Sequence, residues 1–370
     1  MDVLNSLFYL FIGVTFIQIC YYLGIFSRFA FVKMSRPSIK NIGVSVLVCA
    51  KNEAENLRKF IPELIQQHYP KFEIVLINDG STDETLEVMN QFANEFDHVK
   101  VVDVKPNEAF WGNKKYPLTL GIKSASFDFL LFTDADCRPN SPNWIKEMSR
   151  HFSNQHSLIL GYGAYKKVKG SLLNLLIRFE TVFTAIQYFS YALLGSPYMA
   201  VGRNLAYRKE LFFETNGFTR HMNVQSGDDD IFVNDVATSK NTTCCMHQEG
   251  FTESLGETSF KGWFRQKKRH LSASPYYKMK NKILLGLFYF SQLFFWILVI
   301  LLLILNFMPK VVLIIVAVRM LSFLLIYGLS AKKLNELGTI AMSPFLEIFL
   351  ILMQLIIFIS NLTSKKHHWR

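Results

Sequence analysis

Two aspartates, Asp134 and Asp136, directly follow a short, mostly apolar run at 127–132. The run is rich in Phe and Leu and too short for a helix, so it predicts a buried β-strand. Two carboxylates at the end of a core strand are costly to desolvate unless a positive charge compensates them. Hard oxygen ligands favour Mg2+ or Mn2+, ions that often share their coordination with substrate phosphates. The pair therefore predicts a divalent-metal site, although an isolated Asp-x-Asp triplet is also common in solvated turns.

Alternating strands and helices surround this pair and must position it. The expected strands are 44–50, 72–77 and 99–104, and the expected helices are 52–67 and 84–96. This alternation predicts an α/β fold with a mixed, mainly parallel sheet flanked by helices and joined by right-handed crossovers. Ligands of such sheets bind at the carboxyl ends of the strands. Asp79, which follows the second strand, is therefore expected at the same edge as Asp134 and Asp136.

The composition adds a membrane component to this domain. Half of the 370 residues are hydrophobic and 34 are Phe, which is too apolar for a single soluble domain. The net charge is +11, and basic residues gather beside the apolar ends of the chain. This pattern suits anionic lipid headgroups better than nucleic acid, for which no recognition motif is present. The five Cys show no spacing typical of disulfide frameworks or metal sites, which fits a reducing cytoplasm.

Four apolar segments are long enough to span a membrane as helices. They cover residues 7–26, 283–307, 311–328 and 344–362. We therefore expect an N-terminal transmembrane anchor at 1–27, a globular domain at 40–280, a C-terminal transmembrane region of about three helices at 283–362 and a basic tail at 363–370. Opposite charges in neighbouring spans are tolerable when they face each other, so Arg319 and Glu347 are predicted to form a buried pair.

The basic residues that follow the first span place the globular domain in the cytoplasm. Four spans would then put the C-terminal tail outside, although Lys365, Lys366 and Arg370 favour the cytoplasmic side. Either one C-terminal segment is re-entrant or the charge rule fails here, and the sequence leaves both alternatives open.

The order of four segments resembles the nucleotide-sugar half of family 2 inverting glycosyltransferases of the membrane-integral bacterial type. These segments are Val44–Glu53, Val75–Thr85, Gly112–Lys115 leading into Leu118–Ala125, and Phe132–Cys137. The resemblance implies a glycosyltransferase A-like domain that uses a nucleotide sugar, UDP-linked, with residues 40–140 as the donor half and 141–280 as the acceptor half.

Donor roles follow from this resemblance. Donor contacts are implied for Ala50, Glu53, Asp79, Lys114, Lys115 and Asp134, and metal binding for Asp134 and Asp136. Each assignment has a simpler alternative. Asp79 is also typical of a turn and helix cap, the two lysines of a solvated loop, and Glu53 of a first-turn carboxylate favoured by the helix dipole.

The second acidic cluster, Asp228–Asp230, stands where the family has the motif that carries its catalytic base. The resemblance assigns the base to Asp229 and an acceptor contact to Asp228, with Asp230 in reserve because the register could slip by one residue. Adjacent carboxylates raise each other's pKa toward the range useful for a base. Helix capping is the alternative.

Two further segments complete the expected acceptor side. Gly202, Arg203 and Asn204 are assigned acceptor contacts by the resemblance. Residues 172–194 predict an amphipathic helix on the membrane surface or along an acceptor groove, or else a buried core helix.

Gln266 and Arg269 resemble the family's Gln-x-x-Arg-Trp element, with His270 in place of Trp. They share one helix face and are assigned to the leaving diphosphate, since Arg suits phosphate. A basic helix on lipid headgroups is the alternative.

The function predicted from these features is inverting transfer of a sugar from a nucleotide diphosphate to a lipid or lipid-linked acceptor, by a multi-pass protein at the cytoplasmic face of the inner membrane. One alternative is a processive polysaccharide synthase. The other is a non-catalytic nucleotide-sugar-binding component of an export assembly.

Overall fold

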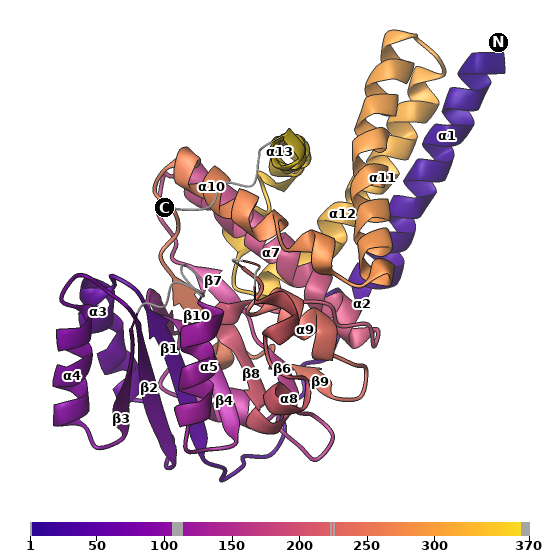
Figure 1. Cartoon of the computed structure of the whole chain (residues 1–370). Helices are drawn as coiled ribbons and strands as arrows, with labels where there is room; N and C mark the ends of the chain where they lie inside the picture. The colour runs from indigo at the N-terminus through magenta and orange to yellow at the C-terminus, as the bar shows by residue number, and fades with distance from the viewer. Residues whose placement is uncertain (1, 106–113, 223, 225, 364–370) are drawn as a thin grey trace.

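A seven-stranded mixed sheet forms the centre of the globular domain (Figure 1). The computed structural model describes residues 2–105, 114–222, 224 and 226–363. The strand order is β3-β2-β1-β4-β8-β6-β9, and the strands are β1 Val44–Ala50, β2 Phe72–Asp79, β3 Val99–Val104, β4 Phe129–Asp134, β6 Leu158–Leu160, β8 Leu205–Arg208 and β9 Thr242–Cys244. The first four positions in this order are parallel, whereas β8 runs antiparallel to β4 and β6. The expected mainly parallel α/β sheet is therefore confirmed.

Helices bury both faces of this sheet. They are α3 Ala54–Ile65, α4 Thr85–Glu95, α5 Lys115–Ser124, α6 Trp144–Ser149, α7 Leu172–Leu193, α8 Lys209–Glu214, α9 Asp230–Val236 and α10 Phe260–Leu271. Successive side chains of β1 point to opposite faces of the sheet, each of which has its own hydrophobic core. Val46 and Val48 pack with α3, α4 and α6 on one face, whereas Leu47 packs with α5 and α7 on the other. A sheet covered on both faces explains why its strands read as continuous apolar runs.

A small second sheet adjoins the main one beside the Asp134–Asp136 turn. Its order is β5-β10-β7, with β5 at Cys137–Pro139, β7 at Gly163–Tyr165 and β10 at Thr252–Ser254. It joins the part of the chain before residue 140 to the part after it, because β5 follows Asp134 and Asp136 directly and β10 leads toward α10.

Among the described residues, four helices are long and apolar enough to cross a membrane, which makes this a membrane protein. They are α1 Asp2–Ile19, which continues through a π-helical turn at Cys20–Phe26 into α2 Ser27–Phe31, and α11 Met279–Ile304, α12 Pro309–Lys333 and α13 Ser343–Thr363. In Figure 1, α1, α11 and α12 run side by side and project from the domain. The last helix, α13, is seen end-on beside α10 in the same view.

The predicted pair between Arg319 of α12 and Glu347 of α13 is confirmed. Two bonds join the guanidinium to the carboxylate, at 2.5 and 2.6 Å. Tyr22 donates to Glu347 at 2.8 Å, and Nε of Arg319 donates to Gln18 at 2.6 Å. A buried ion pair whose remaining donors and acceptors are satisfied is tolerated inside an apolar region.

Helix α7 corrects one expectation from the sequence. It does not lie on a surface: most of its residues are buried, between α2 and α12 on one side and β7 and β9 on the other. Its charges are neutralised internally, since Arg178 pairs with Glu336. Glu180 accepts hydrogen bonds from the Trp263 indole at 3.1 Å and from Lys267 at 2.9 Å. The buried-helix alternative is therefore the one observed, and α7 connects the sheet to the membrane helices.

Candidate active site

One lysine connects two acidic segments at the carboxyl edge of the sheet. Nζ of Lys114 lies 2.6 Å from Oδ1 of Asp134 and 3.7 Å from Oδ2 of Asp228. The three residues come from the start of α5, the end of β4 and the segment before α9. A pocket beside them is lined by Cys49, Lys114, Thr133, Gly202, Asp228 and Asp229, together with apolar side chains. Acids from distant parts of the chain thus converge on one site.

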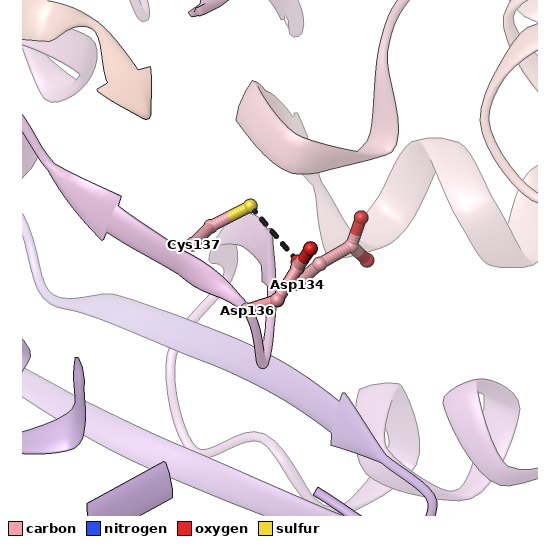
Figure 2. A group of neighbouring side chains, drawn as sticks. All are labelled: Asp134, Asp136 and Cys137. Atoms are coloured by element: carbon pink, nitrogen blue, oxygen red, sulfur yellow. Dashed lines mark hydrogen bonds between the residues drawn. The ribbon is translucent and has the colours of Figure 1, made fainter. Parts of the chain in front are cut away.

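The Asp134–Cys137 turn forms a compact group of potential ligand atoms. One carboxylate oxygen each from Asp134 and Asp136 and the sulfur of Cys137 lie within 4.8 Å of one another (Figure 2). The Cys137 thiol donates to Oδ1 of Asp136 at 3.4 Å. Burial, and then the negative charge of Asp134, raise the pKa of Asp136 to about 6. Burial opposes the ionised form of Asp134 as well, but the Lys114 ammonium outweighs it and lowers that pKa.

Asp229 is held by backbone donors at the start of α9, where it forms the N-cap. Its Oδ2 accepts from the Gly202 N–H at 2.7 Å, and its Oδ1 accepts from the Asp230 N–H at 2.7 Å. Burial, and then the charges of Asp228 and Asp230, raise its pKa to about 8. A carboxylate with a pKa near neutral, fixed in direction by two donors, is suited to accept a proton.

Asp230 is engaged elsewhere. Its Oδ2 accepts from the Tyr277 hydroxyl at 2.6 Å, and its Oδ1 accepts from the Ile231 N–H at 2.7 Å. Unlike Asp229, it is not among the residues that line the pocket. The geometry therefore favours Asp229 over Asp230 as the reacting carboxylate.

Lys115 differs from its neighbour Lys114. Its side chain is 1% exposed, and its ammonium donates to the backbone carbonyls of His221, Val224 and Ser226 at 2.7, 2.9 and 2.9 Å. These carbonyls belong to the segment that leads to Asp228. Lys115 thus holds that segment in place, and Lys114 is the lysine whose ammonium faces Asp134.

The residues expected on the nucleotide side stand at the same sheet edge. Ala50 and Asn78 are register partners at the ends of β1 and β2, and Asp79 follows directly. Burial raises the pKa of Asp79, opposed by nearby Lys51 and Lys114. Glu53 is the N-cap residue of α3 and accepts from Asn56 at 2.6 Å. Gly112 and Asn113 lie outside the described residues.

The three residues of the 202–204 segment make different contacts. Gly202 supplies the N–H to Asp229. The Arg203 guanidinium stacks on Tyr165, 4.1 Å from the ring centroid, and donates to Ser254 at 2.6 Å. Asn204 is fully buried, accepts from the Trp144 indole at 3.0 Å and donates to the carbonyls of Tyr162 and Gly250. The Asn204 side chain is therefore a structural bridge and offers no atom to an acceptor, contrary to expectation.

The end of α10 reaches the site from the other side. Ser226 donates to the backbone carbonyl of Arg269 at 3.3 Å. Burial raises the pKa of Asp134, whereas the positive charges of Lys114, then Arg203 and then Arg269 lower it. Gln266 lies one turn earlier on α10 and is partly buried. The expected diphosphate side of the site is thus close to the metal-type aspartates.

Comparison with known proteins agrees with this geometry. Residues 45–215 match the family described as glycosyl transferase family 2. This match covers less than half of the chain, and it shows a glycosyl transferase family 2 domain that extends from β1 to α8. Over 111 residues this glycosyltransferase is 34% identical to a poly-β-1,6-N-acetyl-D-glucosamine synthase of Staphylococcus epidermidis. The aligned region is 30% of the chain and only 25% of that enzyme. It is 24% identical over 325 residues to a Bacillus subtilis protein named probable glycosyltransferase YdaM, covering 79% of the chain and 74% of YdaM.

A solved structure shares the fold of this glycosyltransferase over almost its whole length. A mannosyltransferase from Pyrobaculum calidifontis, solved in complex with GDP-Man and Mn2+, aligns with 99% of each chain at a TM-score of 0.63. The sequence identity is 14%, so the likeness concerns the fold alone.

Sequence reasoning missed two features of this site. Tyr277, which binds Asp230, lies between the globular domain and α11 and carries no motif that would reveal it. Cys137 joins the aspartate group although no cysteine spacing marks it. Burial raises the pKa of its thiol well above the ordinary value, so it stays neutral and acts as a hydrogen-bond donor.

Proposed function

We propose that this protein transfers a sugar, with inversion, from a nucleotide diphosphate to a lipid or lipid-linked acceptor at the cytoplasmic face of the inner membrane. The observation that carries this proposal is the link from Asp134 through Lys114 to Asp228. Through Lys114, the carboxylate of Asp134 lies beside a pocket that Lys114, Asp228 and Asp229 line. Binding a charged donor and deprotonating an acceptor need these two kinds of group within reach of each other.

The aspartate group fits a hard divalent cation such as Mg2+ or Mn2+. Asp134 and Asp136 offer carboxylate oxygens, which such ions prefer, and the Cys137 sulfur is held as a thiol. A cation bound there would offset the negative charge of the donor's diphosphate. The Lys114 ammonium and the Arg269 guanidinium would supply further positive charge on that side of the site.

The proposed reaction is a single displacement. Asp229 takes the proton of the acceptor hydroxyl while that oxygen forms a bond to the anomeric carbon, and the bond from this carbon to the diphosphate oxygen breaks. The nucleoside diphosphate leaves with the electron pair, and the anomeric centre inverts. The N–H groups of Gly202 and Asp230 direct the Asp229 carboxylate into the pocket throughout. No covalent intermediate on the protein is needed.

A lipid-linked acceptor is supported by how the domain joins the membrane helices. Helix α7 packs against α2 and α12, and Tyr277, the Asp230 partner, lies two residues before α11. The acid cluster is thus within a few residues of an apolar helix. The basic residues after α1 support a cytoplasmic location for this side.

Processive polysaccharide synthesis is a second candidate, favoured by the local similarity to the Staphylococcus epidermidis synthase. The shared part covers only a quarter of that enzyme. The two candidates differ in the length of the product.

The deciding experiment incubates purified protein in lipid vesicles with radiolabelled UDP- and GDP-sugars, Mn2+ and a membrane lipid extract. We expect one donor to label an extractable lipid with a single sugar of inverted configuration. A ladder of polymer would favour the synthase. Absence of binding and transfer with every donor would contradict the enzyme proposal.

A further inference from the structure

Helix α13 differs from the other long apolar helices in its direction. Helices α1, α11 and α12 lie lengthwise and side by side in Figure 1, whereas α13 is viewed along its axis. The axis of α13 therefore runs across the direction of the three-helix bundle. If the bundle crosses a membrane, a helix with this orientation runs along the membrane plane, even though its length and composition alone would allow it to span.

Most side chains of α13 are sorted onto two faces, with the exception of Phe358 near its end, which is 53% exposed on the side of Glu347. Glu347, Leu350, Ile351 and Ile357 are buried against the protein, each at most 4% exposed. The opposite face is a continuous apolar stripe formed by Phe345, Phe349, Leu352, Ile356 and Ile359, spaced by four, three, four and three residues. These side chains are between 37% and 68% exposed. A wholly apolar stripe of this length requires an apolar partner.

Contacts near both ends of α13 fix it in this orientation. Near its start, Glu347 is held by Arg319 of the bundle. Near its end, Ser360 accepts a hydrogen bond from Lys268 of α10 at 3.1 Å, and Asn361 donates to the carbonyl of Lys268 at 3.3 Å. The direction of α13 is therefore built into the fold by polar contacts on both sides.

The neighbouring helix α10 carries charges suited to lipid headgroups. Its exposed side chains include Lys261 and Arg265, one turn apart along one face. Phe260, at the start of α10, packs near Phe349 of the apolar stripe, with ring centroids 6.3 Å apart. An apolar helix face next to a basic one is typical of elements that lie at a membrane interface.

The distribution of basic residues agrees with three spans. Basic residues flank the ends of the three bundle helices that lie near the domain. They are Arg28 and Lys33 after α1, Lys278, Lys280 and Lys282 at the start of α11, and Lys332 and Lys333 at the end of α12. At the far end of the bundle, the first turn of α12 carries Lys310. With α13 in the membrane plane, Lys365, Lys366 and Arg370 join the basic side. This removes the conflict that four spans create.

We propose that α13 is an in-plane membrane helix: only α1, α11 and α12 cross the bilayer, and the apolar stripe of α13 is buried among the acyl chains of the leaflet next to the glycosyltransferase domain. The partner of this surface is the lipid bilayer itself. The residue that follows α13 is then on the same side of the membrane as the catalytic domain.

Depth measurements on the full chain in phospholipid vesicles test this proposal. Nitroxide labels are attached at Phe345→Cys and Ile359→Cys, and their depth is read from collisions with oxygen and with a water-soluble nickel complex. In a spanning helix, 14 residues of separation correspond to about 21 Å in depth. We expect the two α13 labels at equal depth. Labels at Phe290→Cys and Ile304→Cys of α11 have the same separation and are expected to show the full difference.

A second measurement covers the case in which labels disturb α13. A protease-cleavable epitope is placed after Arg370, in the 153–156 loop of the domain, or in the 305–308 connection, and sealed vesicles of known orientation are digested. We expect the first two epitopes on one side and the third on the other. A C-terminal epitope opposite to the domain, or α13 labels separated in depth as in α11, would overturn the proposal.

Discussion

The backbone N–H of Gly202 donates a 2.7 Å hydrogen bond to Oδ2 of Asp229. This bond joins the loop before β8 to the start of α9, two segments that are distant in sequence and that both line the pocket. Gly202 is suited to this approach because a Cβ at this position would lie 3.2 Å from the same carboxylate oxygen. The absence of a side chain lets the backbone reach the acid directly.

Replacing Gly202 with Ala should therefore displace the Asp229 carboxylate without removing it. We expect kcat to fall by about 10- to 100-fold, the cost typical of a small misplacement of a reacting group. Donor Kd should be little changed, because the displaced group faces the acceptor. Steady-state kinetics and donor titration of the variant measure both.

Gly256→Ala is the matched control. A Cβ there would meet Ile177 and Tyr165 at 3.6 Å, an ordinary contact distance, so full activity is expected. Equal losses in both variants would show that the close approach at Gly202 is unimportant.

The rate of transfer should depend on pH through Asp229. With a pKa of about 8, this carboxylate is mostly protonated below pH 8 and cannot then accept a proton. We expect kcat/KM to increase tenfold per pH unit below about 8 and to level off above it. A profile that is flat between pH 6 and 9 would contradict the assignment.

Burial makes the largest contribution to the raised pKa of Asp229, and the negative charge of Asp228 makes the next largest. Asp228→Asn removes a negative charge, so ionisation of Asp229 becomes easier and the midpoint should move to lower pH. A midpoint that moves upward would mean that the titrating group is another residue.

Substitutions of the two adjacent lysines should have different effects, one on donor binding and the other on the stability of the fold. Lys114→Met removes the ammonium that faces Asp134 and should weaken donor binding while the protein remains folded. Lys115→Met leaves three backbone carbonyls without their donor and should lower the free energy of unfolding by about 3 kcal/mol. Donor titration and thermal unfolding of each variant check this division, and the opposite pattern would exchange the two roles.

Metal binding should depend on Asp136. We expect Asp136→Asn to abolish Mn2+ binding in calorimetric titration, and a chelator to stop transfer by the unaltered protein. Asp97→Asn, which changes an exposed carboxylate outside the site, should bind Mn2+ normally. Unchanged Mn2+ affinity in the Asp136 variant would place the cation elsewhere.

Much of the domain fold could be predicted because its strands and helices are locally encoded. The first and third strands were predicted with the bounds that the structure gives, and the second and fourth within two residues, since short apolar runs between turn residues leave few alternatives. Helix α7 was harder, because Arg178 and Glu180 are neutralised by partners far along the chain. The orientation of α13 also could not be predicted, since the length of an apolar segment alone does not distinguish a transmembrane helix from an in-plane helix.

The candidate site was predictable where a role depends on residue type and strand position. Asp134 follows from this logic, whereas Asp228 was assigned by the resemblance to the family's acidic motif; the two residues share Lys114. The side-chain roles of Lys115 and Asn204 could not be predicted, because both are decided by which backbone carbonyls fold around them. The roles of neighbouring residues with the same chemistry, such as Lys114 and Lys115, can be distinguished only from their contacts in the three-dimensional structure.

The most direct test of the account is sugar transfer by Asp229→Asn. The substitution keeps the size of the side chain but removes its capacity to accept a proton. We predict that the variant binds donor and Mn2+ as before, while transfer falls by about 10²- to 10⁴-fold. Full turnover by this variant, under conditions in which the unaltered protein transfers the same sugar, would contradict the account.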